Sequence, residues 1–151
     1  MKKTVKKLFL LFAILFAFSN LFGNDNSLAS IKTLNKIKFE DIALPIALEQ
    51  AFVKEGTTNQ DAQNKLLAMF PKLRHINQKS YLKYQDVALI CMQIYNLEGG
   101  FFYTLTENRH YSFRELQFLN IISQDIDPMK RISGKDAYIL FTKSAELQVA
   151  K

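Results

Sequence analysis

The chain has 151 residues, one cysteine, and 20 Lys and Arg against 14 Asp and Glu, which gives a net charge of +6. This length fits one domain rather than two, and a single cysteine excludes an intrachain disulfide. The positive charge would favour a nucleic-acid binder, but four of the lysines lie in the first seven residues. The N-terminus therefore has to be interpreted before the charge.

Residues 1–23 have the three parts of a secretory signal peptide. Four lysines precede an unbroken apolar run over 8–18, and a polar stretch rich in small residues follows. The run is shorter than the about 20 apolar residues of a transmembrane helix, although an uncleaved N-terminal anchor stays an alternative. We expect cleavage after Gly23, or as late as Ala29, where Ser27 and Ala29 offer small side chains. No cysteine lies near the end of the run, which excludes a lipoprotein.

Removal of residues 1–23 leaves 16 basic against 14 acidic residues, a net charge of +2. A domain this close to neutrality lacks the basic footprint of a nucleic-acid binder. We therefore expect an exported protein of the periplasm or cell envelope. It should bind no nucleic acid and should meet the membrane only transiently, through its signal peptide.

The exported part is predicted to be mostly α-helical. Residues 24–43 show no clear period and are predicted to be a tether. Residues 44–151 are predicted to form a single domain, a small bundle of about five helices, in which 72–80 is a polar connector. With no disulfide available, this domain must be stabilised by its core of Leu, Ile and Phe side chains.

Two helices are predicted in the first half of the domain. Pro45 suits a first helical turn and predicts a helix over 45–54. A second helix is expected to be capped by Thr57 or Thr58, whose side chains accept backbone hydrogen bonds. Pro71 is expected to end it.

The strongest helical pattern spans residues 84–96 and is apolar on most sides, which predicts a central position. Gly99 and Gly100 are expected to stop this helix. Cys91 lies within it and is interpreted as a buried thiol that packs like a small hydrophobic side chain. A second interpretation stays open, in which a partner chain of a periplasmic assembly covers part of the 84–96 helix.

The segment 101–106, FFYTLT, is rich in aromatic and β-branched residues. It is predicted to be either a short strand or an extended segment that packs on the core. Ser112 and Glu115 have the spacing of a capping box, in which each side chain binds the other's backbone amide. They predict a helix over 113–120.

A weak internal repeat marks the end of the chain. Residues 82–90 and 132–140 share an apolar residue, a polar residue, an acid four positions on, and then an apolar helix. An acid in the first turn suits the positive end of a helix. Ser133 and Asp136 therefore predict the start of a last helix over about 134–147.

The motifs between these repeats are HYSFREL (110–116), NII (120–122), DIDP (125–128) and ISGKD (132–136). This order of helix, exit, acidic turn and helix start resembles the S-layer homology (SLH) module of bacterial cell-envelope proteins, over about residues 80–147. The resemblance implies a non-enzymatic helix–turn–helix module, often one that binds cell-wall polymer. Gly134, followed by Lys135, stands where the SLH signature has an arginine. SLH modules usually come in sets of three, and the sequence presents one good copy.

Aromatic and cationic residues gather between the two predicted helices. The candidate binding residues are Tyr103, Arg109, His110, Tyr111 and Arg114. Aromatic planes beside arginines suit a saccharide or an anionic polymer. The alternative is that these residues, with their phenylalanine neighbours, fill the gap between helices.

No arrangement of residues points to catalysis or metal binding. His110 oriented by Glu115 would give a general base, but the capping box and packing explain both residues. Asp125 and Asp127 lack the other ligands of a calcium loop, and no His and Cys spacing suits zinc. We predict no enzyme, cofactor or metal. The expected function is binding or scaffolding, with cell-wall polymer or another envelope protein as the partner.

Overall fold

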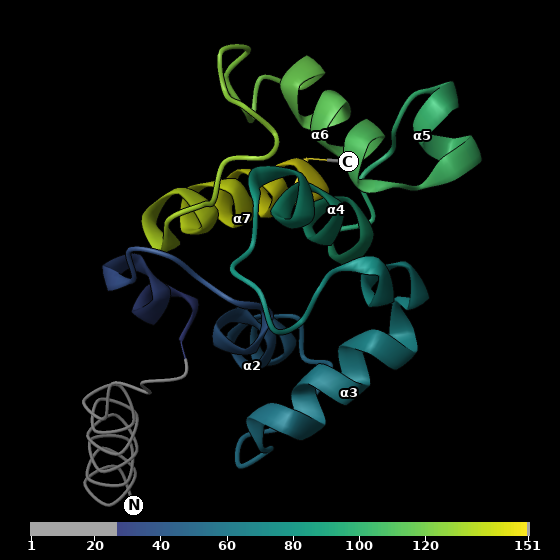
Figure 1. The fold of residues 1–151 in the computed structure, drawn as a ribbon. Helices are drawn as coiled ribbons and strands as arrows, with labels where there is room; N and C mark the ends of the chain where they lie inside the picture. The colour runs from purple at the N-terminus through teal and green to yellow at the C-terminus, as the bar shows by residue number, and fades with distance from the viewer. Residues whose placement is uncertain (1–26, 151) are drawn as a thin grey trace, which may run out of the picture.

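The computed structural model describes residues 27–150, which form a helical domain (Figure 1). Its longer helices are α2 Phe39–Glu49, α3 Asn59–Met69, α4 Tyr84–Ile94, α6 Arg109–Phe118 and α7 Gly134–Val149. Its shorter ones are α5 Phe101–Thr106 and the 3₁₀ helices η1 Leu28–Thr33 and η2 Pro71–His75. Among these residues, strand-like pairing is limited to one isolated bridge between Lys83 and Arg131. The predicted bundle of about five helices is confirmed.

The predicted signal peptide, residues 1–23, lies outside the described residues. Within 27–150, none of the helices combines the length and the apolar character needed to cross a bilayer.

Three helices start with the same short pattern. Residues 37–41, 82–86 and 132–136 each contain a buried Ile or Leu followed four positions later by an Asp at the third position of a helix. Asp41 and Asp86 accept a hydrogen bond from the backbone amide of Lys38 (2.7 Å) and Lys83 (2.9 Å). At α7, the Ser133 hydroxyl accepts from the Asp136 amide instead (3.1 Å). The internal repeat is therefore threefold, and its first copy forms the start of α2.

The three helix starts meet in the middle of the domain. The backbone amide of Leu82 donates to the carbonyl of Ile37 (2.8 Å), and that of Ile132 donates to the carbonyl of Leu82 (3.0 Å). All three side chains are fully buried. We call the segments 34–38, 81–84 and 130–134 the junction. It joins the three repeats through backbone hydrogen bonds and a shared apolar centre.

Each repeat contributes one packed pair of helices. α2 packs against α3, α4 against α6, and α7 against η1. The last pair joins the two ends of the described chain, which Figure 1 shows as the purple η1 beside the yellow α7. The N-terminal segment therefore supplies the helix that the third repeat lacks.

Gly134 is required by this last pairing. A Cβ atom at this position would lie 1.8 Å from the carbonyl oxygen of Ile31 in η1, far inside contact distance. The Gly134 amide donates to the carbonyl of Leu34 (2.8 Å). Glycine at this position thus lets η1 approach the start of α7.

The predicted tether over 24–43 is wrong for the residues that the structure describes. Residues 28–33 form η1 and α2 begins at Phe39, with Ile31, Ile37, Phe39 and Ile42 buried. No period was visible because these apolar residues lie successively on a 3₁₀ helix, an extended segment and an α-helix. Residues 24–26 fall outside the described part.

Two other helix boundaries differ in the first half. α2 starts six residues before Pro45, which lies in the helix interior rather than in its first turn. The 72–80 connector is not polar throughout, because η2 buries Leu73 and Ile76 lies in the core. The predicted cap at Thr58 is confirmed, since its hydroxyl accepts from the Asp61 amide (3.1 Å).

The second half contains two further corrections. The segment 101–106 forms α5, neither a strand nor an extended segment. α6 begins at Arg109 with Asn108 as its cap, whose side chain accepts from the Tyr111 amide (3.0 Å). The predicted capping box of Ser112 and Glu115 does not form, because Ser112 lies inside the helix and donates to the carbonyl of Asn108.

α4 is the central helix, as its apolar pattern predicted. Nine of its eleven residues are buried, and the chain's own α6 and α7 pack against it. It ends through a left-handed Asn96 (φ 47°) rather than at Gly99 and Gly100. A partner chain is not needed to cover α4, so an interface with another protein has to use a different surface.

Candidate functional site

The five predicted binding residues lie on α5 and α6, and the structure divides them into two groups. Tyr103 is buried, and its hydroxyl accepts a hydrogen bond from Gln93 Nε2 of α4 (2.9 Å). Arg109 Nη1 lies 3.0 Å from Oδ1 of Asp86, a carboxylate whose side chain is 7% exposed. These two contacts hold α5 and α6 against α4. The Tyr103 hydroxyl and the Arg109 guanidinium are therefore already engaged within the domain.

The other three predicted residues are brought together. His110, Tyr111 and Arg114 line an open pocket of about 560 Å³ with Phe102 and Phe118. Gly100 and Glu115 complete its wall. The structure therefore forms one concave site from three of the five predicted residues.

Exposed apolar side chains lie on the two helices that form this pocket. Phe101, Phe102, Leu105 and Phe118 are 60–80% exposed. We call these four residues, with His110, Tyr111 and Arg114, the α5–α6 surface. Full burial of such a side chain is worth roughly 1.5–3 kcal/mol. A partner that covers these side chains would therefore gain a large hydrophobic contribution to its binding free energy.

The aromatic rings of this surface contact one another. Phe102 stacks on Tyr111 with centroids 5.5 Å apart and planes 13° apart. Phe101 meets Phe102 edge-on at 5.6 Å, and His110 meets Tyr111 edge-on at 5.2 Å. Such offset and edge-on pairs are the favourable arrangements of aromatic rings. The four rings form one row, which a partner would meet as a single preformed surface.

The sequence predicted that these aromatic residues lie near one another, but it did not predict which of them are exposed. Of these residues, Tyr103 and Phe113 fill the core, whereas Phe101 and Phe102 do not. It missed Leu105 and Phe118. Phe118 could have been found, because it lies off the inward-facing positions of its helix, which include Phe113 and Leu116. Leu105 gave no such signal, since α5 itself was not predicted.

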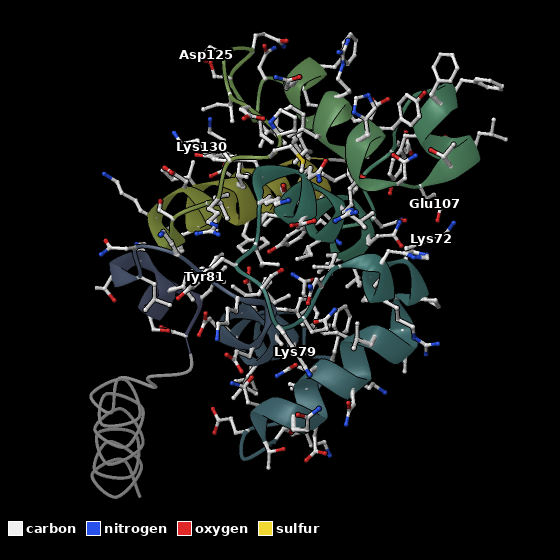
Figure 2. The ribbon with its side chains drawn as sticks, viewed as in Figure 1. Lys72, Lys79, Tyr81, Glu107, Asp125 and Lys130 are labelled. Carbon is white, nitrogen blue, oxygen red and sulfur yellow. The ribbon has the colours of Figure 1, made fainter. Side chains whose placement is uncertain are left out.

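An exposed ion pair and a left-handed residue lie at the end of α5. Lys72 Nζ of η2 lies 4.0 Å from Glu107 Oε2, just after α5, and Figure 2 labels both side chains. The Glu107 backbone is left-handed (φ 45°), which turns the chain from α5 into α6. α5 therefore presents its exposed rings from a short helix that ends in a tight turn into α6.

The site offers no arrangement for acid–base chemistry. Within residues 27–150, His110 makes no hydrogen bond or ion pair with Glu115, whose carboxylate lies over Gly100 instead. Burial raises the pKa of Tyr103, which keeps its hydroxyl neutral. Among the described residues, no three His, Cys, Asp or Glu side chains are grouped as metal ligands would be.

A larger pocket of about 760 Å³ lies between η1, α2 and α7. Its walls are mostly apolar and include Leu28, Ala29 and Tyr138, with the carboxylates of Glu49 and Glu146 at its margin. Burial raises the pKa of Glu49. None of the predicted site residues lines this pocket.

Comparison of the chain with protein-family models, curated proteins and solved structures finds no significant match. What the chain binds is therefore inferred from its own residues.

Proposed function

We propose that this chain is an exported, non-enzymatic protein of the periplasm or cell envelope whose α5–α6 surface binds another envelope protein. The exposure of Phe101, Phe102 and Leu105 on α5 and of Phe118 on α6 carries the proposal, and Phe102 and Phe118 line one pocket. Contiguous exposed apolar side chains of this kind mark interaction sites in soluble domains. Aromatic residues flanked by arginine are also typical of the central residues of protein interfaces.

The chemistry of the surface favours a protein over a sugar polymer. Phenylalanine rings offer no hydrogen-bonding group, whereas a saccharide needs several partners for its hydroxyls. One face of the Tyr111 ring is also covered by Phe102. The rim carries Arg114, His110 and Glu115. A protein with an apolar patch edged by polar and charged side chains complements both features.

Export rests on residues 1–23, and the position of η1 supports the earlier cleavage site. Cleavage after Ala29 would cut through η1, whose Ile31 is buried, whereas cleavage after Gly23 leaves η1 whole. N-terminal sequencing of the protein from a periplasmic fraction should begin at Asn24. A chain that begins at Met1 and stays in the inner membrane would contradict the proposal.

Contact with cell-wall polymer is the second candidate, and the threefold repeat favours it. The resemblance of about residues 80–147 to an SLH module implies this contact, and the three helix starts of the domain meet at one junction. Sedimentation with purified peptidoglycan tests it against an unrelated exported protein. Retention no greater than that of the unrelated protein would exclude this candidate.

The main proposal is tested with a Phe101→Ser/Phe118→Ser variant. Both side chains are more than 70% exposed, so the fold should be unaffected. The partner is recovered by crosslinking in cells and purification from the envelope fraction. A Met69→Ser/Val149→Ser variant is the matched control, since it removes two exposed apolar side chains elsewhere.

We expect a defined protein adduct with the wild type and the control, and loss of that adduct with the Phe101→Ser/Phe118→Ser variant. An adduct recovered equally from all three proteins would overturn the proposal. So would an adduct that consists of a second copy of the chain.

A further inference from the structure

Three cations gather around one exposed tyrosine at the junction. The Nζ atoms of Lys36 and Lys38 each lie 5.8 Å from the ring centroid of Tyr81, and the guanidinium of Arg131 lies 5.6 Å from it. The Tyr81 residue is 42% exposed. In Figure 2 it lies between Lys130 and Lys79, on the side where the purple N-terminal segment meets α7. We call Lys36, Lys38, Tyr81 and Arg131 the junction patch.

The internal repeat sets the positions of these side chains. Lys36, Tyr81 and Arg131 each directly precede the buried apolar residue of their repeat. The junction hydrogen bonds that link Leu82 to its two equivalents hold the three segments together. The backbone therefore brings the three segments that carry Lys36, Tyr81 and Arg131 side by side.

Most of this charge is not neutralised within the domain. Of the ion pairs among the described residues, one involves the patch, between Lys38 Nζ and Glu40 Oε1 at 3.4 Å. Asp41, the other nearby acid, accepts the Lys38 backbone amide with its carboxylate. Like charges around one ring repel one another, so an anionic ligand would remove an unfavourable interaction.

Apolar side chains accompany the cations. Leu34 is 37% exposed and Met129 is 52% exposed, and each lies two residues before a patch cation, Lys36 or Arg131. Cations interspersed with aliphatic and tyrosine side chains are typical of surfaces that lie in the headgroup region of a bilayer. A free phosphate ion would gain nothing from these apolar groups.

We propose that the junction patch binds the anionic phospholipid headgroups of a membrane surface. Lys36, Lys38 and Arg131 would contact headgroup phosphates, and the Tyr81 ring would lie at the level of the headgroups. This contact is peripheral and independent of the signal peptide. It also lies apart from the α5–α6 surface, so the domain would hold a partner protein against the membrane.

The test is sedimentation of the exported protein with vesicles of phosphatidylglycerol and phosphatidylcholine, compared with phosphatidylcholine alone. We expect binding that requires phosphatidylglycerol. Each cation near an anionic surface contributes about fivefold in affinity. A Lys36→Gln/Lys38→Gln/Arg131→Gln variant should therefore bind about a hundredfold more weakly. Tyr81→Ser should bind more weakly without any change in charge.

A Lys54→Gln/Lys65→Gln/Lys143→Gln variant is the matched control, because it removes the same charge from exposed positions elsewhere. It should keep most of the binding. Equal loss in both triple variants would overturn the proposal, since net charge alone would then explain the binding. Binding to phosphatidylcholine alone would also overturn it.

A third experiment distinguishes binding to a lipid surface from binding to a free phosphate group. If inorganic phosphate or glycerol phosphate displaces the protein at low concentration, the site takes a free anion and the proposal is wrong. The Phe101→Ser/Phe118→Ser variant should bind the vesicles like the wild type. This separates failure of the membrane contact from failure of the protein contact.

Discussion

Cys91 shows how burial sets the chemistry of a single residue. Its side chain is fully buried in α4, and burial raises the pKa of the thiol to about 12. The thiolate is the reactive form, so the native protein at about pH 8 should not react with a thiol reagent such as DTNB. In concentrated guanidinium chloride the one thiol should react fully. Fast labelling of the native protein would contradict the buried position.

The buried carboxylate of Asp86 has two partners. Its Oδ2 accepts the Lys83 amide at 2.9 Å, and its Oδ1 accepts from Arg109 at 3.0 Å. Asp86→Asn should lower the free energy of unfolding by about 1–3 kcal/mol, because one charge-assisted hydrogen bond is lost and Arg109 loses its partner. Urea denaturation measures the loss.

Arg109→Gln should lower the free energy of unfolding by less when Asp86→Asn is already present, because the two residues interact directly. If the two losses simply add, the ion pair contributes nothing. The comparison also shows why Arg109 was predicted to bind a ligand. Its partner lies 23 positions earlier in the chain, and the sequence alone does not bring them together.

At the scale of the elements, α2, α4 and α6 end in the same way. Each is followed by a left-handed residue, at Ala51 (φ 54°), Asn96 (φ 47°) and Asn120 (φ 57°). The next amide in each case donates back into the helix, at 2.8–3.1 Å. This is the Schellman motif, in which the left-handed position favours glycine and tolerates asparagine. Alanine is therefore the unfavourable choice among the three.

Ala51→Gly should raise the free energy of unfolding by about 1 kcal/mol, because an L-residue with a Cβ is strained in this conformation. Ala68→Gly, on the exposed side of α3, is the matched control and should lower the stability by about 0.5–1 kcal/mol. Both changes are measured by chemical denaturation. Loss of stability at both positions would show that the backbone at Ala51 is not left-handed.

Gly134→Ala should separate η1 from α7. The added Cβ would overlap the Ile31 carbonyl, a backbone atom that cannot move alone. We expect a loss of about 1–3 kcal/mol, with faster amide hydrogen exchange concentrated in 28–33. Gly100→Ala is the control, since its Cβ would meet only the flexible Glu115 carboxylate. Equal losses at both glycines would contradict the close approach of η1.

The elements that the sequence predicted well carry local signals. α3 and α7 have side-chain caps at Thr58 and Ser133, and α4 has a continuous apolar period. η1 and α5 lack both signals. η1 is six residues long and stabilised by α7, and α5 is six residues long and leaves two phenylalanines exposed. Their structure depends on tertiary contacts, which no local pattern reveals.

At the scale of the molecule, three helix pairs surround one junction, and the N-terminal η1 completes the third pair. The repeat was visible from residues 82 and 132 but not from residue 37, because the first copy lies 45 positions before the second and the third lies 50 after it. The unequal spacing hides the symmetry, and the junction hydrogen bonds reveal it. The candidate site was also predicted only in part, because three of the five predicted binding residues line one pocket.

The claim that the α5–α6 surface binds an envelope protein is tested most directly by site-specific photocrosslinking in intact cells. A photoreactive residue replaces Phe102, and a second protein carries it at Lys65, which is exposed. Lys65 belongs to α3, a helix that lies away from α5 and α6 (Figure 1). We predict one discrete protein adduct from position 102 in the envelope fraction and none from position 65. No adduct at either position, or the same adducts at both, would contradict the account.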